Sequence, residues 1–162
     1  SSYYLTCDRV NGVLTVYTDS TMRIPIKTIR VSVGKAGTET PTGTWTMHRA
    51  GRWQELMGPS WGQYGTHVVN GIFVHSVACG QANSYNLPVG EYLRLGNPAS
   101  HGCIRACVAD AKWVWDNCNG SKIHIFDGTY TSNEALKGPL GRKALTPLRG
   151  SKNFDPTDPA CK

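Results

Sequence analysis

Short runs in which apolar and polar residues alternate recur along the first 127 residues of the chain, bounded by glycine, proline or asparagine. Alternation with a period of two is typical of half-buried strands. We expect strands at residues 3–7, 13–18, 24–33, 44–48, 68–69, 72–74 and 122–126. Asn11-Gly12 and Asn70-Gly71 separate pairs of these runs and predict tight hairpin turns. The pattern therefore predicts a mostly β fold.

One later segment has helical periodicity instead. Apolar residues recur there at spacings of three and four, at Val108, Ala111, Val114, Trp115 and Cys118. We expect one helix over 108–118, starting between Ala106 and Val108 and stopped by Asn119-Gly120. Residues 34–43, 51–65 and 84–95 are expected to be loops.

The length fits one domain. Its 162 residues are 40% hydrophobic, enough for a core, and we expect the core at about 3–127 with a surface-packed tail at 128–162. The net charge of +6 favours polyanionic partners. The basic residues are scattered, however, which fits an ordinary solvated surface. No signal peptide or membrane span is recognisable, and a secretion signal or anchor could precede Ser1.

Cysteine usage indicates an oxidising compartment, with residues Cys7, Cys79, Cys103, Cys107, Cys118 and Cys161 in a short chain. The sequence does not fix their pairing. Cys7 with Cys161 is the bridge we favour, because chain ends are often close in space. A continuous helix between Cys107 and Cys118 would hold them too far apart to bond.

The most informative chemistry lies in Ser100–Arg105, together with His75-Ser76. Cys103 is the candidate nucleophile and His75 its base, because a thiol needs a base to attack efficiently. Ser76 would orient the imidazole. Gly102 would permit a tight turn whose amides hold an oxyanion. A helix starting just after Cys103 would also stabilise its thiolate.

The remaining residues of these motifs have expected roles beside the pair. Ser100 and His101 would shape the pocket, and we count His101 among the catalytic residues and Ser100 among the substrate-binding ones. Arg105 would bind a substrate carboxylate. The loop at 51–65 carries Trp61 and Tyr64, which we assign to substrate binding or a mobile lid, with plain packing as the alternative.

These motifs resemble the YkuD-type L,D-transpeptidases, and in particular a subgroup common in Gram-positive bacteria. The matching segments are His75-Ser76, Ser100-His101-Gly102-Cys103-Ile104-Arg105, Thr40-Pro41-Thr42-Gly43-Thr44-Trp45 after Val33-Gly34-Lys35, and Arg52-Trp53 with Gly62-Gln63-Tyr64. The resemblance covers about residues 14–127. It implies a β-sandwich with one short helix following the catalytic cysteine loop.

The resemblance also implies a reaction. Cys103 would form a thioacyl-enzyme from a peptidoglycan tetrapeptide stem and release D-alanine. A side-chain amine of a neighbouring stem would then accept the acyl group, linking third residue to third residue. Carbapenem β-lactams would acylate the same cysteine. Alternatives at the same site are L,D-carboxypeptidase activity and D-amino-acid exchange.

The resemblance further implies a secreted enzyme of cell wall biogenesis and cell shape, held in the wall or on the outer face of the membrane. We expect peptidoglycan stems as partners, no nucleic acid, no cofactor, no metal and a monomer. His75 and Cys103 lie further apart in sequence than is usual in the family, which predicts an insertion within 79–99.

Three other interpretations are weaker. A zinc site could use His75, His101, Cys103 and Cys107, but the usual ligand spacings are missing. A sortase-like enzyme would carry a different cysteine motif. A catalytically inactive wall-binding module would keep the fold and charge, yet the complete motif argues against it.

Overall fold

The computed structural model describes residues 2–150 and 153–161, so Ser1 and parts of the expected tail, 151–152 and 162, lie outside it. Its larger sheet contains β1 (Tyr4–Asp8), β2 (Val13–Tyr17), β3 (Pro25–Arg30), β4 (Gly43–Thr46) and β11 (Lys122–Phe126). Their order is β3-β2-β1-β11-β4. β1 runs parallel to β11, and the other neighbours are antiparallel. The predicted strands at 3–7, 13–18 and 122–126 and the Asn11-Gly12 hairpin are thereby confirmed, whereas the strand predicted at 24–33 ends at Arg30 and the one predicted at 44–48 is interrupted at Met47.

A second sheet carries the candidate chemistry. It contains β5 (His48–Arg49), β8 (Thr66–Val69), β9 (Ile72–Ser76) and β10 (Ile104–Ala106), in the order β10-β9-β8-β5. β9 pairs antiparallel with β8 across Asn70-Gly71, as the sequence predicted. β10 runs parallel to β9 and sets Arg105 opposite His75. The two halves of the sequence motif therefore meet on neighbouring strands.

The expected loop at 51–65 is wrong. It forms a separate hairpin of β6 (Trp53–Leu56) and β7 (Ser60–Gln63). Trp61 extends this hairpin by exchanging backbone hydrogen bonds with Cys79 in the segment after β9. The glycines at 51–65 suggested an irregular backbone, but this segment forms strands because β6 and β7 pair with each other and Trp61 pairs with Cys79.

The helix prediction is nearly confirmed by α2 (Val108–Asn117), which packs against β9 and β10. The segment expected to be irregular at 84–95 contains a second helix, α1 (Val89–Leu93). A short 3-10 turn, η1 (Glu134–Leu136), follows the last strand. The fold is mostly β, as predicted, with one helix more than the resemblance implied.

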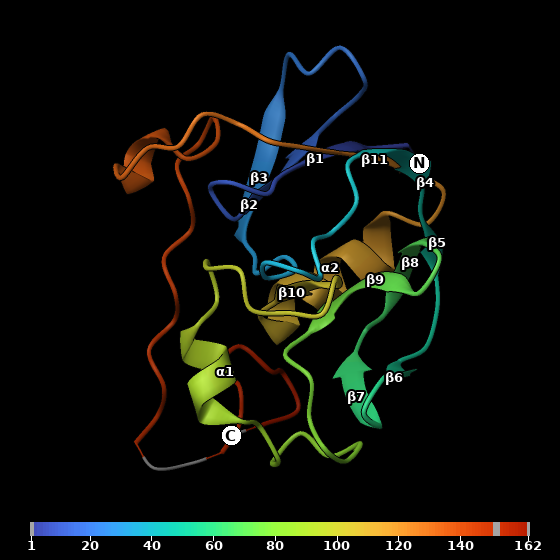
Figure 1. Ribbon diagram of the computed structural model, residues 1–162, viewed down its shortest axis with the longest axis vertical. Coiled ribbons are helices and arrows are strands. Elements are labelled where there is room, and N and C mark those ends of the chain that lie inside the picture. Colours follow the sequence, from blue (N-terminus) through green and yellow to red (C-terminus); the bar gives the residue numbers. More distant parts are fainter. Residues whose placement is uncertain (1, 151–152, 162) are drawn as a thin grey trace.

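The core lies between the two sheets and α2. Its fully buried members include Leu5, Leu14, Met47, Ile104 and Ile123. The segment after β11 runs down one side of the molecule past β3 to α1, as the orange and red ribbon in Figure 1 shows. No helix of the described residues is long and apolar enough to cross a membrane.

The expected Cys7–Cys161 bridge is wrong: all six cysteines are free. The physical reason is the layout of the chain ends. Cys7 lies in the core on β1, whereas the C-terminal end lies beside α1, far from the N-terminal end in Figure 1. The expectation that Cys107 and Cys118 stay unbonded agrees with their positions just before and just after α2.

Candidate active site

A groove of about 400 Å³ lies between the β6–β7 hairpin, β9 and the loop that precedes β10. Its lining includes Ser60, Phe73, His75, Ser100, His101, Cys103 and Arg105. The predicted nucleophile and base therefore share one groove. Leu56, Met57, Ile72 and Ala78 add apolar surface to the lining.

Cys103 lies at the end of the motif loop, directly before β10, and its side chain reaches across to β9. The Phe73 amide donates to its Sγ at 3.4 Å, and the Gly71 carbonyl lies 3.6 Å from the same atom. Burial raises the pKa of the Cys103 thiol, while the Phe73 amide and the Arg105 charge act in the opposite direction. At rest the group is a thiol that needs a base.

The expected stabilisation of Cys103 by a helix N-terminus is wrong. β10 lies between Cys103 and α2, and the helix begins only at Val108, with Cys107 as its N-cap residue. The first amides of α2 donate to Asp155 Oδ2 (from Val108, 2.8 Å) and Thr157 Oγ1 (from Ala109, 3.1 Å). The helix N-terminus is thus occupied by the C-terminal segment.

The backbone of the motif loop is held from below by Thr40. Its hydroxyl donates to the Gly102 carbonyl at 2.7 Å and accepts from the Gly34 amide at 2.9 Å. Gly102 has φ +130°, and a Cβ there would lie 2.8 Å from Ile72 Cδ1. Only glycine fits this position without strain. The predicted tight turn is therefore present.

The Gly102 amide does not point into an oxyanion site as expected. It donates to Ser100 Oγ at 3.1 Å, and Ser100 Oγ in turn donates to the Cys103 carbonyl. Ser100 is buried and shapes the loop, whereas His101 is exposed at the groove. The amide that does reach the sulfur is that of Phe73.

His75 lies near the end of β9 with only 2% of its surface exposed. Its Nδ1 hydrogen-bonds the carbonyl oxygen of Ser76, which requires a proton on Nδ1 and leaves Nε2 unprotonated. Burial lowers the pKa of His75 to about 4, and the Arg105 charge adds to this, although the Ser76 bond opposes it. The imidazole is therefore neutral at pH 7, with Nε2 as its unprotonated nitrogen.

Two neighbours fix the imidazole. Ser76 Oγ accepts from the Gln63 amide at 2.8 Å, which joins β9 to the hairpin. Gly62 packs directly on the ring, where a Cβ would lie 2.5 Å from His75 Nδ1. Ser76 thus orients the base through its carbonyl, as predicted from sequence, and through a second contact that sequence did not indicate.

Arg105 lines the groove but is already paired. Its Nη1 donates to Glu91 Oε1 at 2.9 Å, and its side chain is 12% exposed. Glu91 belongs to α1, inside the segment that the sequence identified as an insertion. A substrate carboxylate would compete with Glu91 for this guanidinium.

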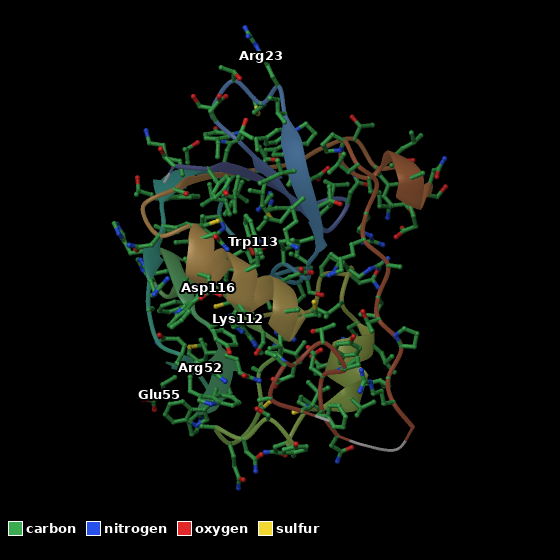
Figure 2. The ribbon with its side chains drawn as sticks, turned by 180° about the vertical axis from the view of Figure 1, so that it is seen from behind. Arg23, Arg52, Glu55, Lys112, Trp113 and Asp116 are labelled. Carbon is green, nitrogen blue, oxygen red and sulfur yellow. The ribbon has the colours of Figure 1, made fainter. Side chains whose placement is uncertain are left out.

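The structure does not bring Trp61 and Tyr64 to the groove lining. Tyr64 is buried, with its ring 5.4 Å from Trp115 and the Arg52 guanidinium 4.1 Å above it. Figure 2 shows Arg52 near the hairpin on the face that also carries Lys112 and Asp116 of α2.

Within residues 2–150 and 153–161, no three His, Cys, Asp or Glu side chains are placed to hold a metal.

Sequence reasoning missed three groups that support the site: Thr40, Gln63 and Glu91. Thr40 and Gln63 stood inside recognised motifs, so the motifs located them without revealing their contacts. Nothing in the sequence linked Glu91 to Arg105.

Comparison with known proteins identifies the family to which this fold belongs. The sequence pattern of YkuD, the L,D-transpeptidase catalytic domain, matches residues 2–135. The chain therefore belongs to the L,D-transpeptidase catalytic domain family. Over 27 residues it is 59% identical to the putative L,D-transpeptidase YciB of Bacillus subtilis, covering 17% of this chain and 14% of that protein.

Solved structures share the fold at low identity. A fused Zn-dependent amidase/peptidase/peptidoglycan-binding protein from Clostridium acetobutylicum aligns with TM-score 0.60 and 23% identity, over 78% of this chain and 52% of that one. The LD transpeptidase LdtMt1, solved in complex with imipenem, aligns with TM-score 0.60 and 21% identity, over 77% and 59%. The chain thus spans somewhat more than half the length of these structures.

Proposed function

We propose that this chain is a cysteine-dependent L,D-transpeptidase that remodels peptidoglycan stem peptides. The observation that carries the proposal is the shared groove of Cys103 and His75, with His75 Nδ1 bound to Ser76 so that Nε2 is the basic nitrogen. Membership of the family supports the reaction type. The imipenem complex of LdtMt1 supports β-lactam binding in this fold.

Acylation begins with transfer of the Cys103 thiol proton to His75 Nε2. The sulfur attacks the carbonyl carbon between the third stem residue and the terminal D-alanine. The imidazolium then returns the proton to the leaving amine, and D-alanine departs as the thioester forms. The Phe73 amide, 3.4 Å from the sulfur, stabilises the developing thiolate.

Deacylation reverses the proton transfers. A side-chain amine of a second stem attacks the thioester and gives a proton to His75, and the Cys103 thiolate recovers a proton from the imidazolium as it leaves. The product is a cross-link between third residues. Water or a free D-amino acid in place of the amine gives carboxypeptidase or exchange activity.

The proposed substrate implies an enzyme outside the cytoplasmic membrane, in the wall or anchored on the outer face. Its +6 net charge favours association with anionic wall polymers. We also propose that it acts as a monomer; one chain supplies both halves of the site, so a second copy is not needed to complete it.

Intact-protein mass spectrometry after incubation with imipenem tests the proposal. We expect one imipenem adduct on the wild type and on Cys79→Ala, a matched control that removes a buried thiol. Cys103→Ala should form none, and His75→Ala should form it far more slowly. A folded wild type that stays unmodified would contradict the proposal. Incubation with a tetrapeptide stem then separates the activities, because cross-linked dimer, tripeptide and exchanged stem differ in mass.

A further inference from the structure

The C-terminal segment Asn153–Cys161 makes contacts that resemble those of an internal element. Asp155 and Asp158 are 2% and 3% exposed, which is unusual burial for carboxylates. Asp155 Oδ2 caps α2 through the Val108 amide, and Thr157 Oγ1 accepts from Ala109. We call residues 153–161 the C-terminal strap.

Asp158 connects the strap to the hairpin beside the active site. Its Oδ2 accepts from Gln63 Nε2 at 3.0 Å, and its Oδ1 accepts from the Ala160 amide at 2.9 Å. The oxygen of the Gln63 side chain is also engaged, because Arg52 Nη1 donates to Gln63 Oε1 at 2.8 Å. The Gln63 side chain is therefore fixed in position and in amide orientation.

Gln63 reaches the base by two short routes. Its backbone amide donates to Ser76 Oγ at 2.8 Å, and the carbonyl of Ser76 accepts from His75 Nδ1. Its chain neighbour Gly62 packs on the imidazole itself. Every polar link between Asp158 and His75 is buried, and buried polar networks act as units.

We propose that Asp158 and Gln63 are positioning residues for His75, through which the C-terminal strap holds the catalytic imidazole in its reactive tautomer and orientation. This inference rests on the proposed role of His75 as the base for Cys103. It assigns a function to a segment beyond residue 135, where the family match ends.

The hydrogen bond from Gln63 to Asp158 can be tested by exchanging which of the two residues is the amide donor and which is the carboxylate acceptor. In Asp158→Asn, if the new side-chain oxygen keeps the Ala160 amide, the new NH₂ faces Gln63 Nε2, so two donors oppose each other. In Gln63→Glu, two carboxylates oppose each other. The double variant restores a donor–acceptor pair, because the amide now at position 158 donates to the carboxylate now at position 63. It also keeps the contacts to Arg52 and Ala160.

Asp155→Ala is the matched control for these variants. It removes a buried carboxylate of the same strap, but one that bonds α2 instead of the hairpin. A general loosening of the strap would affect this control as much as the variants at positions 63 and 158.

The readout is the rate of Cys103 alkylation by iodoacetamide between pH 5 and 9, located by peptide mass spectrometry and measured well below each variant's melting temperature. Each single variant should lose on the order of tenfold at pH 7, a part of the 10²–10⁴ that a positioned base supplies. The double variant should recover most of this loss. Asp155→Ala should melt earlier but keep the wild-type pH profile.

Wild-type alkylation rates and pH profiles in both single variants would overturn the proposal, even if they melt earlier. Equal losses in the single and double variants would overturn it as well. Because alkylation needs no peptidoglycan and no β-lactam, the result is independent of the substrate. A wild type that alkylates normally but never reacts with imipenem would contradict the proposed function and leave the positioning network intact.

Discussion

Gly62 occupies a position where the His75 imidazole leaves no room for a side chain. A Cβ at residue 62 would lie 2.5 Å from Nδ1 and 2.8 Å from Cγ of His75, closer than van der Waals contact allows. The atom in the way is the one that donates to the Ser76 carbonyl. A methyl group at residue 62 would therefore displace the His75 imidazole directly, and it would disturb the hydrophobic core much less.

We therefore expect Gly62→Ala to abolish most of the acylation of Cys103 by imipenem while the protein stays folded. The imidazole would have to rotate or shift, which breaks its bond to Ser76 and misplaces Nε2. Acylation rates by mass spectrometry and the melting temperature check this together. Gly90→Ala is a suitable control, because Gly90 is exposed and a Cβ there would meet nothing within 4 Å. Wild-type acylation in Gly62→Ala would show that the ring position is not critical.

The buried imidazole also predicts an unusual pH dependence. Because burial lowers the His75 pKa to about 4, the base stays neutral well below the pH at which an exposed histidine becomes protonated. The fraction of unprotonated His75 should thus remain nearly constant from pH 7 to 5 and fall as the pH approaches 4. Alkylation of Cys103, corrected for the rate in His75→Ala at each pH, measures this. A midpoint near 6.5 would contradict it.

Among the elements, the loop at 34–43 supports the catalytic loop from beneath. Thr40 is completely buried and joins the Gly34 amide to the Gly102 carbonyl. Thr38 adds a bond from its hydroxyl to the Ser100 carbonyl at 3.1 Å. The threonine-rich motif of the sequence thus acts as a brace under the nucleophile.

Thr40→Val should weaken that brace without changing the shape of the side chain. The Gly34 amide and the Gly102 carbonyl would both lose their partner in a buried place, at a cost of about 1–3 kcal/mol. We expect a lower free energy of unfolding in urea and slower acylation of Cys103. Thr40→Ser keeps the hydroxyl and should stay nearer to wild type in both. Unchanged stability and acylation in Thr40→Val would contradict a role for the hydroxyl.

Local patterns predicted the elements whose sequences have a clear period, and missed elements that are very short or rich in glycine. β1, β2 and α2 follow from period and turn residues, and the Cys103–His75 pair follows from motif chemistry. β10 escaped because three residues give no usable period, and its stability comes from β9. α1 escaped because it is one short turn next to Pro88.

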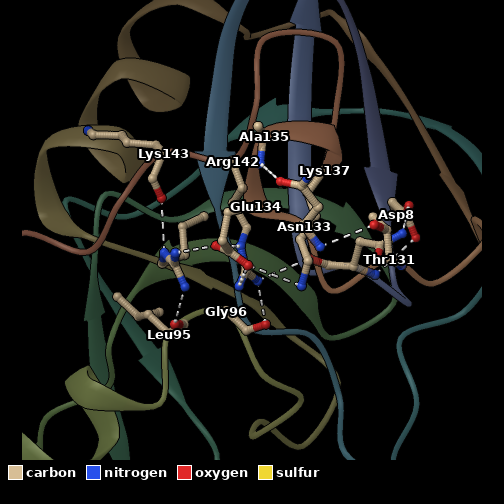
Figure 3. Close-up of polar contacts among 12 residues, drawn as sticks. Asp8, Leu95, Gly96, Thr131, Asn133, Glu134, Ala135, Lys137, Arg142 and Lys143 are labelled. Carbon is tan, nitrogen blue, oxygen red and sulfur yellow. Dashed lines mark hydrogen bonds and ion pairs between the residues drawn. The ribbon is translucent and has the colours of Figure 1, made fainter.

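On the side of the molecule that carries η1, a cluster of ion pairs around Glu134 connects distant parts of the chain. Glu134 contacts Arg30 Nη2 at 2.7 Å, Arg142 Nη2 at 2.8 Å and Lys137 Nζ at 3.2 Å. Arg142 Nη1 also donates to the carbonyls of Asn11 and Gly96. Figure 3 shows Glu134, Arg142 and Gly96 in this cluster. This cluster therefore joins β3, the turn after β1, the inserted segment and the chain after β11.

The stabilisation by the Glu134 ion pairs should be lost over a defined range of acidic pH. Hydrogen bonding to Arg142, helped by Lys137 and Arg30, lowers the pKa of Glu134 to about 2 from 4.5. A carboxyl whose pKa is lower in the folded state stabilises the fold above its unfolded pKa, and this contribution is lost as pH falls from 4.5 towards 2. Its side chain is 47% exposed, so solvent screening limits the contribution to about 1 kcal/mol.

Glu134→Gln should therefore lower the free energy of unfolding by about 1 kcal/mol at pH 7. The difference from wild type should shrink in 1 M salt, which screens the charges. It should shrink again as pH falls from 4.5 to 3, because Glu134 of the unfolded wild type then binds a proton that the folded state still excludes. Asp116→Asn, which removes one surface pair with Lys112, is the control and should change stability by only a few tenths of that amount. Urea titrations at pH 3, 4.5 and 7 decide the matter. A difference in the free energy of unfolding that persists unchanged at pH 3 would mean that Glu134 stabilises the fold through packing and not through its ion pairs.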